Sequence, residues 1–239
     1  ISVACLRNQG GRFSEAQIML SRQDLALGAM LLLRKGRPDL AISLADADRQ
    51  RDPLAWARWN QSGLARVLCG RFEEALPFYH RAEALGPAPI TRAEHALALA
   101  RIGRRAEAVA KVHEAFAPAN TTGWPGGFVA LAVGIAAWAL VEAHAHSEAE
   151  KLLGQLREGP EERRWNAVHA LLRLGAVDEA VPLLAEANQL ALFFPLFLCA
   201  DDPRLCDDPR IRAAFQRADS LEALDSFSAA LRGHGPENR

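Results

Sequence analysis

The sequence predicts an all-α protein, a solenoid of about six helical hairpins closed by a C-terminal helical cap. Three observations predict it. A six-residue signature close to Gly-x-x-x-Glu-Ala recurs at a spacing near the low thirties, and repeats of that period stack into solenoids. Apolar residues form 50% of the 239-residue chain, enough for a sizeable core. Aromatic residues form only 7%, which favours closely packed helices over a β-sandwich.

The signature sets the order of the units. Its copies begin at Gly11, Gly36, Gly70, Gly103 and Gly175, with a degenerate copy that lacks the glycine at His144. Six units, the first truncated, are therefore predicted over residues 1–192. The first two copies lie only 25 residues apart, so we expect a shortened second helix near residues 18–23.

The unit over residues 56–89 has the clearest pattern. Characteristic residues flank Ala75 of its signature: Trp59, Gly63 and Gly70 precede it, and Tyr79, Ala82 and Pro87 follow it. This pattern resembles the tetratricopeptide repeat, a 34-residue helix-turn-helix. The resemblance implies a right-handed superhelix in which Gly63 and Ala75 let the paired helices cross closely. The unit departs from the family at Arg66, where a large apolar residue is usual.

An insertion separates two units. The copies at Gly103 and His144 lie 41 residues apart, and the extra residues 120–127 contain turn formers around Trp124. We expect a loop there. Insertions in solenoids are often functional, and the alternative is a neutral insertion whose Trp124 packs against the neighbouring hairpin.

The repeat pattern stops after residue 192. Residues 193–232 contain an apolar run and two Asp-Asp-Pro-Arg strings, in which Asp can cap a helix that begins with Pro. We expect one short turn and then a helix carrying Ile211 and Phe215, with Leu221, Leu224 and Phe227 as further candidates, which together would cap the solenoid. This segment resembles the tail that follows tetratricopeptide arrays in bacterial regulators. Residues 233–239 are predicted to be a disordered tail.

Composition narrows the classes of function and the setting. The charge is nearly balanced, with 28 basic and 29 acidic residues, which argues against a nucleic-acid partner. The four cysteines form no Cys-x-x-Cys pair and are predicted to be reduced core residues of a cytoplasmic protein. The longest apolar run, residues 128–141, is too short for a membrane span. Because the chain begins inside a repeat, we expect a fragment of a longer protein.

Protein binding is the predicted function. The resemblance implies a concave groove lined by the first helix of each hairpin. Its positions here are mainly apolar, with aromatic anchors and edge arginines, which suits an amphipathic helix, a peptide or another subunit. Asn60 has no accompanying lysines, which argues against a clamp for a terminal carboxylate. The predicted contacts are Asn60, Arg101, Trp138, Trp165, His169 and Arg173. The alternative is a groove covered from within, by tight winding or by the tail.

Other functions are weaker predictions. His144 and His146 would point to different sides of one helix, and His144 with Glu148 gives too few ligands for a metal, so no metal site is predicted. Phosphate-binding and nucleophile motifs are absent from the sequence, so neither an enzyme nor a cofactor is predicted. Two alternatives remain open: a regulatory module of a larger bacterial protein, for example a winged-helix regulator, and a small-molecule receptor with its ligand between Trp138 and Trp165.

Overall fold

A computed structural model describes residues 28, 29, 32, 35, 37–186, 197–199, 201–217 and 221–233. Over these residues the chain is helical and contains no strand, so the all-α prediction is confirmed. The predicted short helix near residues 18–23 and the predicted tail beyond Gly233 lie outside the described residues, as does Cys5.

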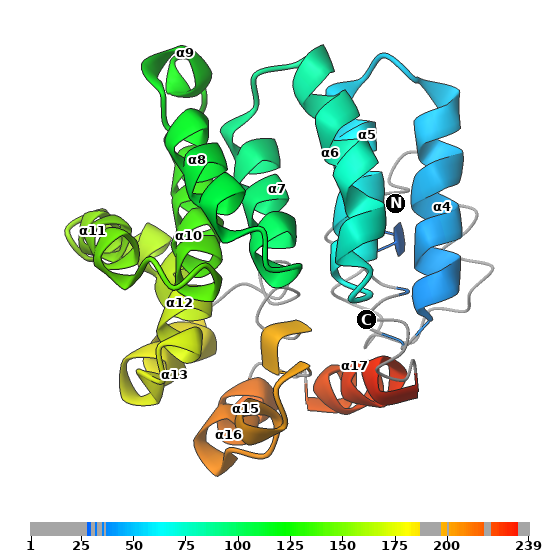
Figure 1. Ribbon diagram of the computed structural model, residues 1–239. Helices are drawn as coiled ribbons and strands as arrows, with labels where there is room; N and C mark the ends of the chain where they lie inside the picture. Colours follow the sequence, from blue (N-terminus) through cyan, green and yellow to red (C-terminus); the bar gives the residue numbers. More distant parts are fainter. Residues whose placement is uncertain are drawn as a thin grey trace.

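Helix α4 (Pro38–Arg51) is followed by pairs of consecutive helices that pack against each other (Figure 1). The pairs are α5 (Trp56–Val67) with α6 (Phe72–Leu85), α7 (Pro89–Arg101) with α8 (Arg105–Ala115), and α10 (Gly126–Glu142) with α11 (His146–Arg157). In the fourth pair the first helix begins as a 3₁₀ segment, η1 (Glu161–Ala167), and continues as α12 (Val168–Arg173). It packs on the second helix of that pair, α13 (Val177–Glu186). Neighbouring pairs also pack together, through α6 against α7, α7 against α10, and α10 against α12.

The signature glycines close the turn inside each pair. Gly70, Gly103 and Gly175 have φ of 74°, 81° and 79°, a left-handed conformation that glycine adopts without a steric penalty. In each turn the next backbone N–H bonds to the carbonyl oxygen five residues earlier, which ends the first helix with a Schellman motif. His144 occupies the same place in the third pair, with φ 62° and the same hydrogen bond from Ala145 to Leu140.

Small residues bring the helices together. The signature alanines Ala75, Ala108, Ala149 and Ala180 are fully buried. A Cβ at Gly63 would lie 2.9 Å from the Tyr79 ring, as the predicted close crossing requires. The contact of α10 with η1 is closer still, because a Cβ at Gly134 would lie 2.1 Å from the Asn166 carbonyl oxygen.

Helices α7 and α10 lie in the interior. Every residue from Pro89 to Ala100 is buried, and so is every residue from Ala132 to Val141. These stretches include the positions expected to line an open groove. A helix buried on all sides has no face left for solvent.

Arg66, the departure from the repeat pattern, has a local explanation. Its guanidinium makes two hydrogen bonds to the Asp46 carboxylate of α4, at 3.1 and 2.7 Å, and lies 3.8 Å from the centre of the Phe78 ring. An arginine can replace an apolar residue here because its charge is paired and its plane covers an aromatic face.

The predicted loop at residues 120–127 is shorter than expected. Asn120 and Thr121 end a short helix, α9 (Pro118–Thr121), and α10 begins at Gly126. Pro118 fixes a helical φ at the first position, and the Asn120 side chain donates to the Glu114 carbonyl oxygen at 2.7 Å. Trp124 packs edge-on against Trp56 of α5, with ring centroids 5.5 Å apart, so it does contact an earlier hairpin.

The predicted short turn and following helix form in the C-terminal segment, but Leu221 and Leu224 lie on a separate helix and not on the one that carries Ile211 and Phe215. Asp202 accepts a hydrogen bond from the Arg204 N–H and caps α15 (Pro203–Cys206). Asp208 accepts from the Arg210 N–H at the start of α16 (Pro209–Arg217), which buries Ile211 and Phe215 against α13 and α17 (Leu221–Gly233). Leu224 is also buried, Leu221 is half-buried, and the Phe227 side chain lies outside the described residues. Cys69, Cys199 and Cys206 are buried free thiols, as predicted.

The contact at Gly134 gives a direct test of the packing. We expect Gly134→Ala to lower the free energy of unfolding by about 1–3 kcal/mol or more, because the added methyl group meets backbone atoms that cannot move aside. Gly154→Ala in α11 is the matched control, since a Cβ there has open space and should stabilise the helix by about 0.5–1 kcal/mol. Urea unfolding measures both, and equal effects would contradict the close crossing.

Candidate functional site: an ion-paired inner face

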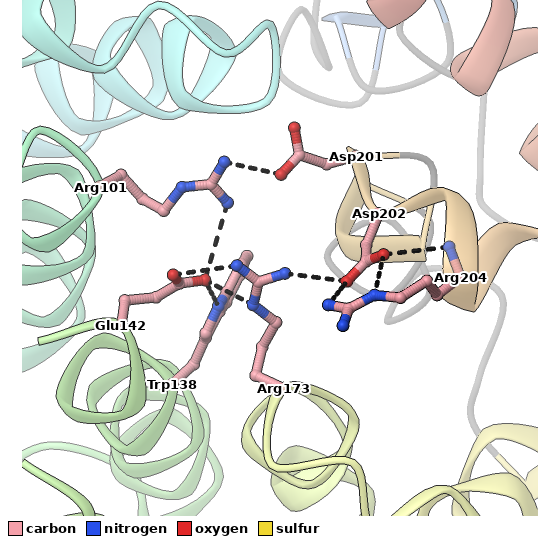
Figure 2. Close-up of polar contacts among 7 residues, drawn as sticks. All are labelled: Arg101, Trp138, Glu142, Arg173, Asp201, Asp202 and Arg204. Atoms are coloured by element: carbon pink, nitrogen blue, oxygen red, sulfur yellow. Dashed lines mark hydrogen bonds and ion pairs between the residues drawn. The ribbon is translucent and has the colours of Figure 1, made fainter. Parts of the chain in front are cut away.

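The first helices of three successive pairs end in a charged residue. Arg101, Glu142 and Arg173 are the last residues of α7, α10 and α12, and their side chains converge (Figure 2). Trp138 lies one turn before Glu142, and His169 one turn before Arg173. We call the cluster of Arg101, Glu142 and Arg173, together with Trp138 and His169 directly beneath them, the inner face. It contains four of the six residues predicted to contact a partner.

Glu142 joins the charges of the inner face. Its carboxylate accepts hydrogen bonds from Trp138 Nε1 at 2.9 Å and Arg173 Nη2 at 3.0 Å, while Arg173 Nε lies at 2.7 Å. Arg101 Nη1 lies 3.7 Å from the same carboxylate. A carboxylate at the C-terminal end of a helix opposes the helix dipole. The two guanidinium groups and the indole N–H compensate it.

An acidic pair from the C-terminal segment completes the site. Asp201 accepts a hydrogen bond from Arg101 Nη2 at 2.6 Å, across 100 positions of sequence. Asp202 lies 3.5 Å from Arg173 Nη1 and pairs with Arg204 at 2.9 Å (Figure 2). The hydrogen bond from Arg204 lowers the pKa of Asp202 below its usual value, and the charge of Arg173 contributes to this. The Asp202 carboxylate is therefore held in its charged form.

Phe197 anchors the same segment. Its fully buried ring lies 6.2 Å, centroid to centroid, from both Phe72 of α6 and Trp138 of α10. The Arg101 guanidinium lies 4.6 Å from the Phe72 ring centre and 6.0 Å from that of Phe197. One arginine thus contacts the Phe197 ring and binds Asp201 of the acidic pair. Such aromatic–arginine combinations are typical of the residues that carry binding energy.

Trp138 and His169 are not at the surface. Both are fully buried, and their rings stack with 5.7 Å between centroids and 7° between planes. Burial lowers the pKa of His169 to about 4, so the imidazole is neutral at physiological pH. In this conformation neither ring can touch a partner. At these two positions the protein itself covers the groove, which is the alternative that the sequence left open.

The remaining predicted contacts lie apart from the inner face. Asn60 is buried in α5, and its side-chain amide donates to the Glu94 carboxyl at 3.0 Å. Burial raises the pKa of Glu94 to about 8, so this carboxyl is mainly protonated at neutral pH. Trp165 is half-buried in η1. Asn60 thus makes a hydrogen bond in the interior of the protein. Only four of the six predicted contact residues lie together in one site.

Sequence reasoning missed two parts of the site. The sequence pattern assigns no role to Glu142, and it predicts the acidic residues of the Asp-Asp-Pro-Arg strings only as helix caps. Asp202 both caps α15 and pairs with Arg173, whereas Asp201 pairs with Arg101. One feature of the sequence could have indicated this pairing: Asp201 and Asp202 are adjacent acids, and Arg101 and Arg173 occupy equivalent positions of the repeat pattern.

An open cleft of about 570 Å³ adjoins the site. Its lining includes His144, His146, Arg173, Asp202 and Arg204. The prediction that both histidines lie on one helix is wrong. His144 is in the turn and His146 begins α11, which brings their rings to 6.0 Å. Among the described residues, no group of three or more His, Cys, Asp or Glu side chains is placed to hold a metal ion.

Comparison with known proteins gives no further assignment. No protein-family model matches this chain, and no curated protein sequence matches it significantly. None of the described helices combines the length and apolarity needed to cross a bilayer. The paired charges and the aromatic anchor can bind and orient a polypeptide segment.

The stack on Trp138 predicts a pH dependence. The folded protein keeps His169 neutral, whereas the unfolded chain protonates it below about pH 6.5. Protonation therefore favours unfolding, and stability should fall by about 3 kcal/mol between pH 6.5 and pH 4. We expect His169→Phe, which keeps a flat ring, to reduce that fall, as measured by urea unfolding at several pH values. The exposed His146→Gln is the control, and an unchanged fall in His169→Phe would contradict the assignment.

Proposed function

We propose that this chain is a protein-binding module of tetratricopeptide-like helical hairpins that takes a segment of another protein on its inner face. The observation that carries the proposal is the docked acidic pair. Arg101 and Arg173 already hold Asp201 and Asp202 of a polypeptide segment there. A surface that binds one segment through paired charges and a buried aromatic ring has the features of a peptide-recognition site.

The residues of the inner face would have separate roles in recognition. The arginines bind carboxylates and fix the register of the segment, because a guanidinium presents several donors in one plane. Glu142 holds both guanidinium groups in place through the contacts described above. Trp138 and Phe72 form the walls around the aromatic ring.

A regulatory module within a larger protein is a second candidate. One observation favours it: the inner face is covered by the C-terminal segment of the same chain, so a partner has access only when that segment moves. A buried site of this kind converts binding into a conformational change. The scaffold and the regulator would use the same residues and differ in the consequence of binding.

Loss of the arginines should abolish binding selectively. Wild-type protein is incubated with a lysate of the source cells, and the proteins bound to it are crosslinked and identified. We expect the Arg101→Gln/Arg173→Gln variant not to crosslink these proteins. The matched control is Arg104→Gln/Arg157→Gln, which removes two exposed, ion-paired arginines elsewhere and should retain the same proteins. Circular dichroism checks the fold of each variant. If all variants crosslink the same proteins, the inner face is not the binding site.

A further inference from the structure

The chemistry of the docked segment defines the kind of partner. We propose that the inner face recognises a helical turn with an aromatic residue followed, four and five positions later, by two acidic residues, and that Phe197, Asp201 and Asp202 compete with such a turn of a partner protein. This inference rests on the proposed function and specifies the partner for the same site.

The spacing of the segment explains how one surface recognises it. Residues 197–199 are helical, and Asp201 follows Phe197 by four positions, which places the two side chains on one side of a helical turn. Phe197 enters the space between Phe72 and Trp138, while Asp201 reaches Arg101, the arginine that also contacts the Phe197 ring. Asp202 lies toward Arg173. The aromatic anchor and the acidic pair are therefore recognised together.

The charges of the two surfaces are complementary. Arg101, Glu142 and Arg173 sum to +1, and Asp201, Asp202 and Arg204 of the segment, the last of which pairs with Asp202, together bring −1. A segment without acids would leave two arginines facing one carboxylate. A cap covers the apolar end of a helical array and presents a polar outer face, and neither role requires ion pairs to the array. The matched acids thus exceed what a cap needs and indicate recognition of a specific segment.

The charge contacts are suited to exchange. The side chains of Arg101, Arg173, Asp201 and Asp202 keep between 10% and 20% of their surface exposed. Because these ion pairs keep some exposure to solvent, added salt should weaken them. The segment is continuous with α15 and α16, so after release it stays tethered near the inner face. A tether of this kind competes at millimolar effective concentration, and a partner must overcome it.

A labelled peptide with the sequence of residues 193–206, added to the full chain, tests the competition. In wild type we expect weak binding by fluorescence anisotropy, because the chain's own segment occupies the inner face. In Asp201→Asn/Asp202→Asn the peptide should bind about ten-fold or more tightly. Asparagine keeps the cap of α15, so this variant is expected to remain folded. High salt should weaken the binding.

Matched peptides and hosts make the result specific. Peptides with Ala in place of the anchor Phe197, or with Asn in place of both acids, should not bind the Asp201→Asn/Asp202→Asn host. The further change Arg101→Glu should abolish binding of the native peptide and restore it for a peptide with Lys at position 201. Equal binding of all peptides would overturn the proposal, and so would no binding by a folded host.

Failure of the peptide competition can be distinguished from failure of the proposed protein-binding function. If the peptide fails to bind while crosslinking to cellular proteins still depends on Arg101 and Arg173, the inner face binds proteins of another chemistry, and the competition is wrong. If crosslinking is also independent of these arginines, the protein-binding function of the inner face fails with it.

Discussion

The inner face depends on the carboxylate of Glu142. This single group accepts hydrogen bonds from Trp138 and Arg173 and lies within ion-pair distance of Arg101. Without it, two guanidinium groups would face one another at the ends of α7 and α12. With it, their remaining donors point outward and take Asp201 and Asp202. One negative charge at an unfavourable helix end thus organises a surface that binds negative charge.

Close packing explains why this surface lies where it does. Small residues let α10 approach η1 at Gly134, and α7 and α10 are buried along most of their length. Only the ends of these helices remain near solvent, and the ion pairs of the inner face are made by their last residues. The buried stack of Trp138 on His169 holds the C-terminal ends of α10 and α12 at a fixed distance from each other.

Local patterns predicted the fold better than the site. The glycine signature identified the turns because a left-handed residue is required at one place in each, and even His144 adopts that conformation. The sequence predicts a shared role for Arg101 and Arg173 because they occupy equivalent positions of the repeat pattern, and the structure brings both to Glu142. The sequence offers the burial of Trp138 only as an alternative, because Phe197, whose ring packs against it, lies 59 positions further along the chain. The pairing of Arg101 with Asp201 is equally non-local, and no spacing rule encodes it.

The coupling between Arg101 and Asp201 tests the role of the inner face most directly. A double-mutant cycle with Arg101→Gln and Asp201→Asn, measured by urea unfolding of the full chain, isolates their interaction from the cost of each change alone. We predict a coupling of about 1 kcal/mol at low salt that decreases as salt is added. Additive effects of the two changes, with no dependence on salt, would show that the acidic pair is not held by the inner face.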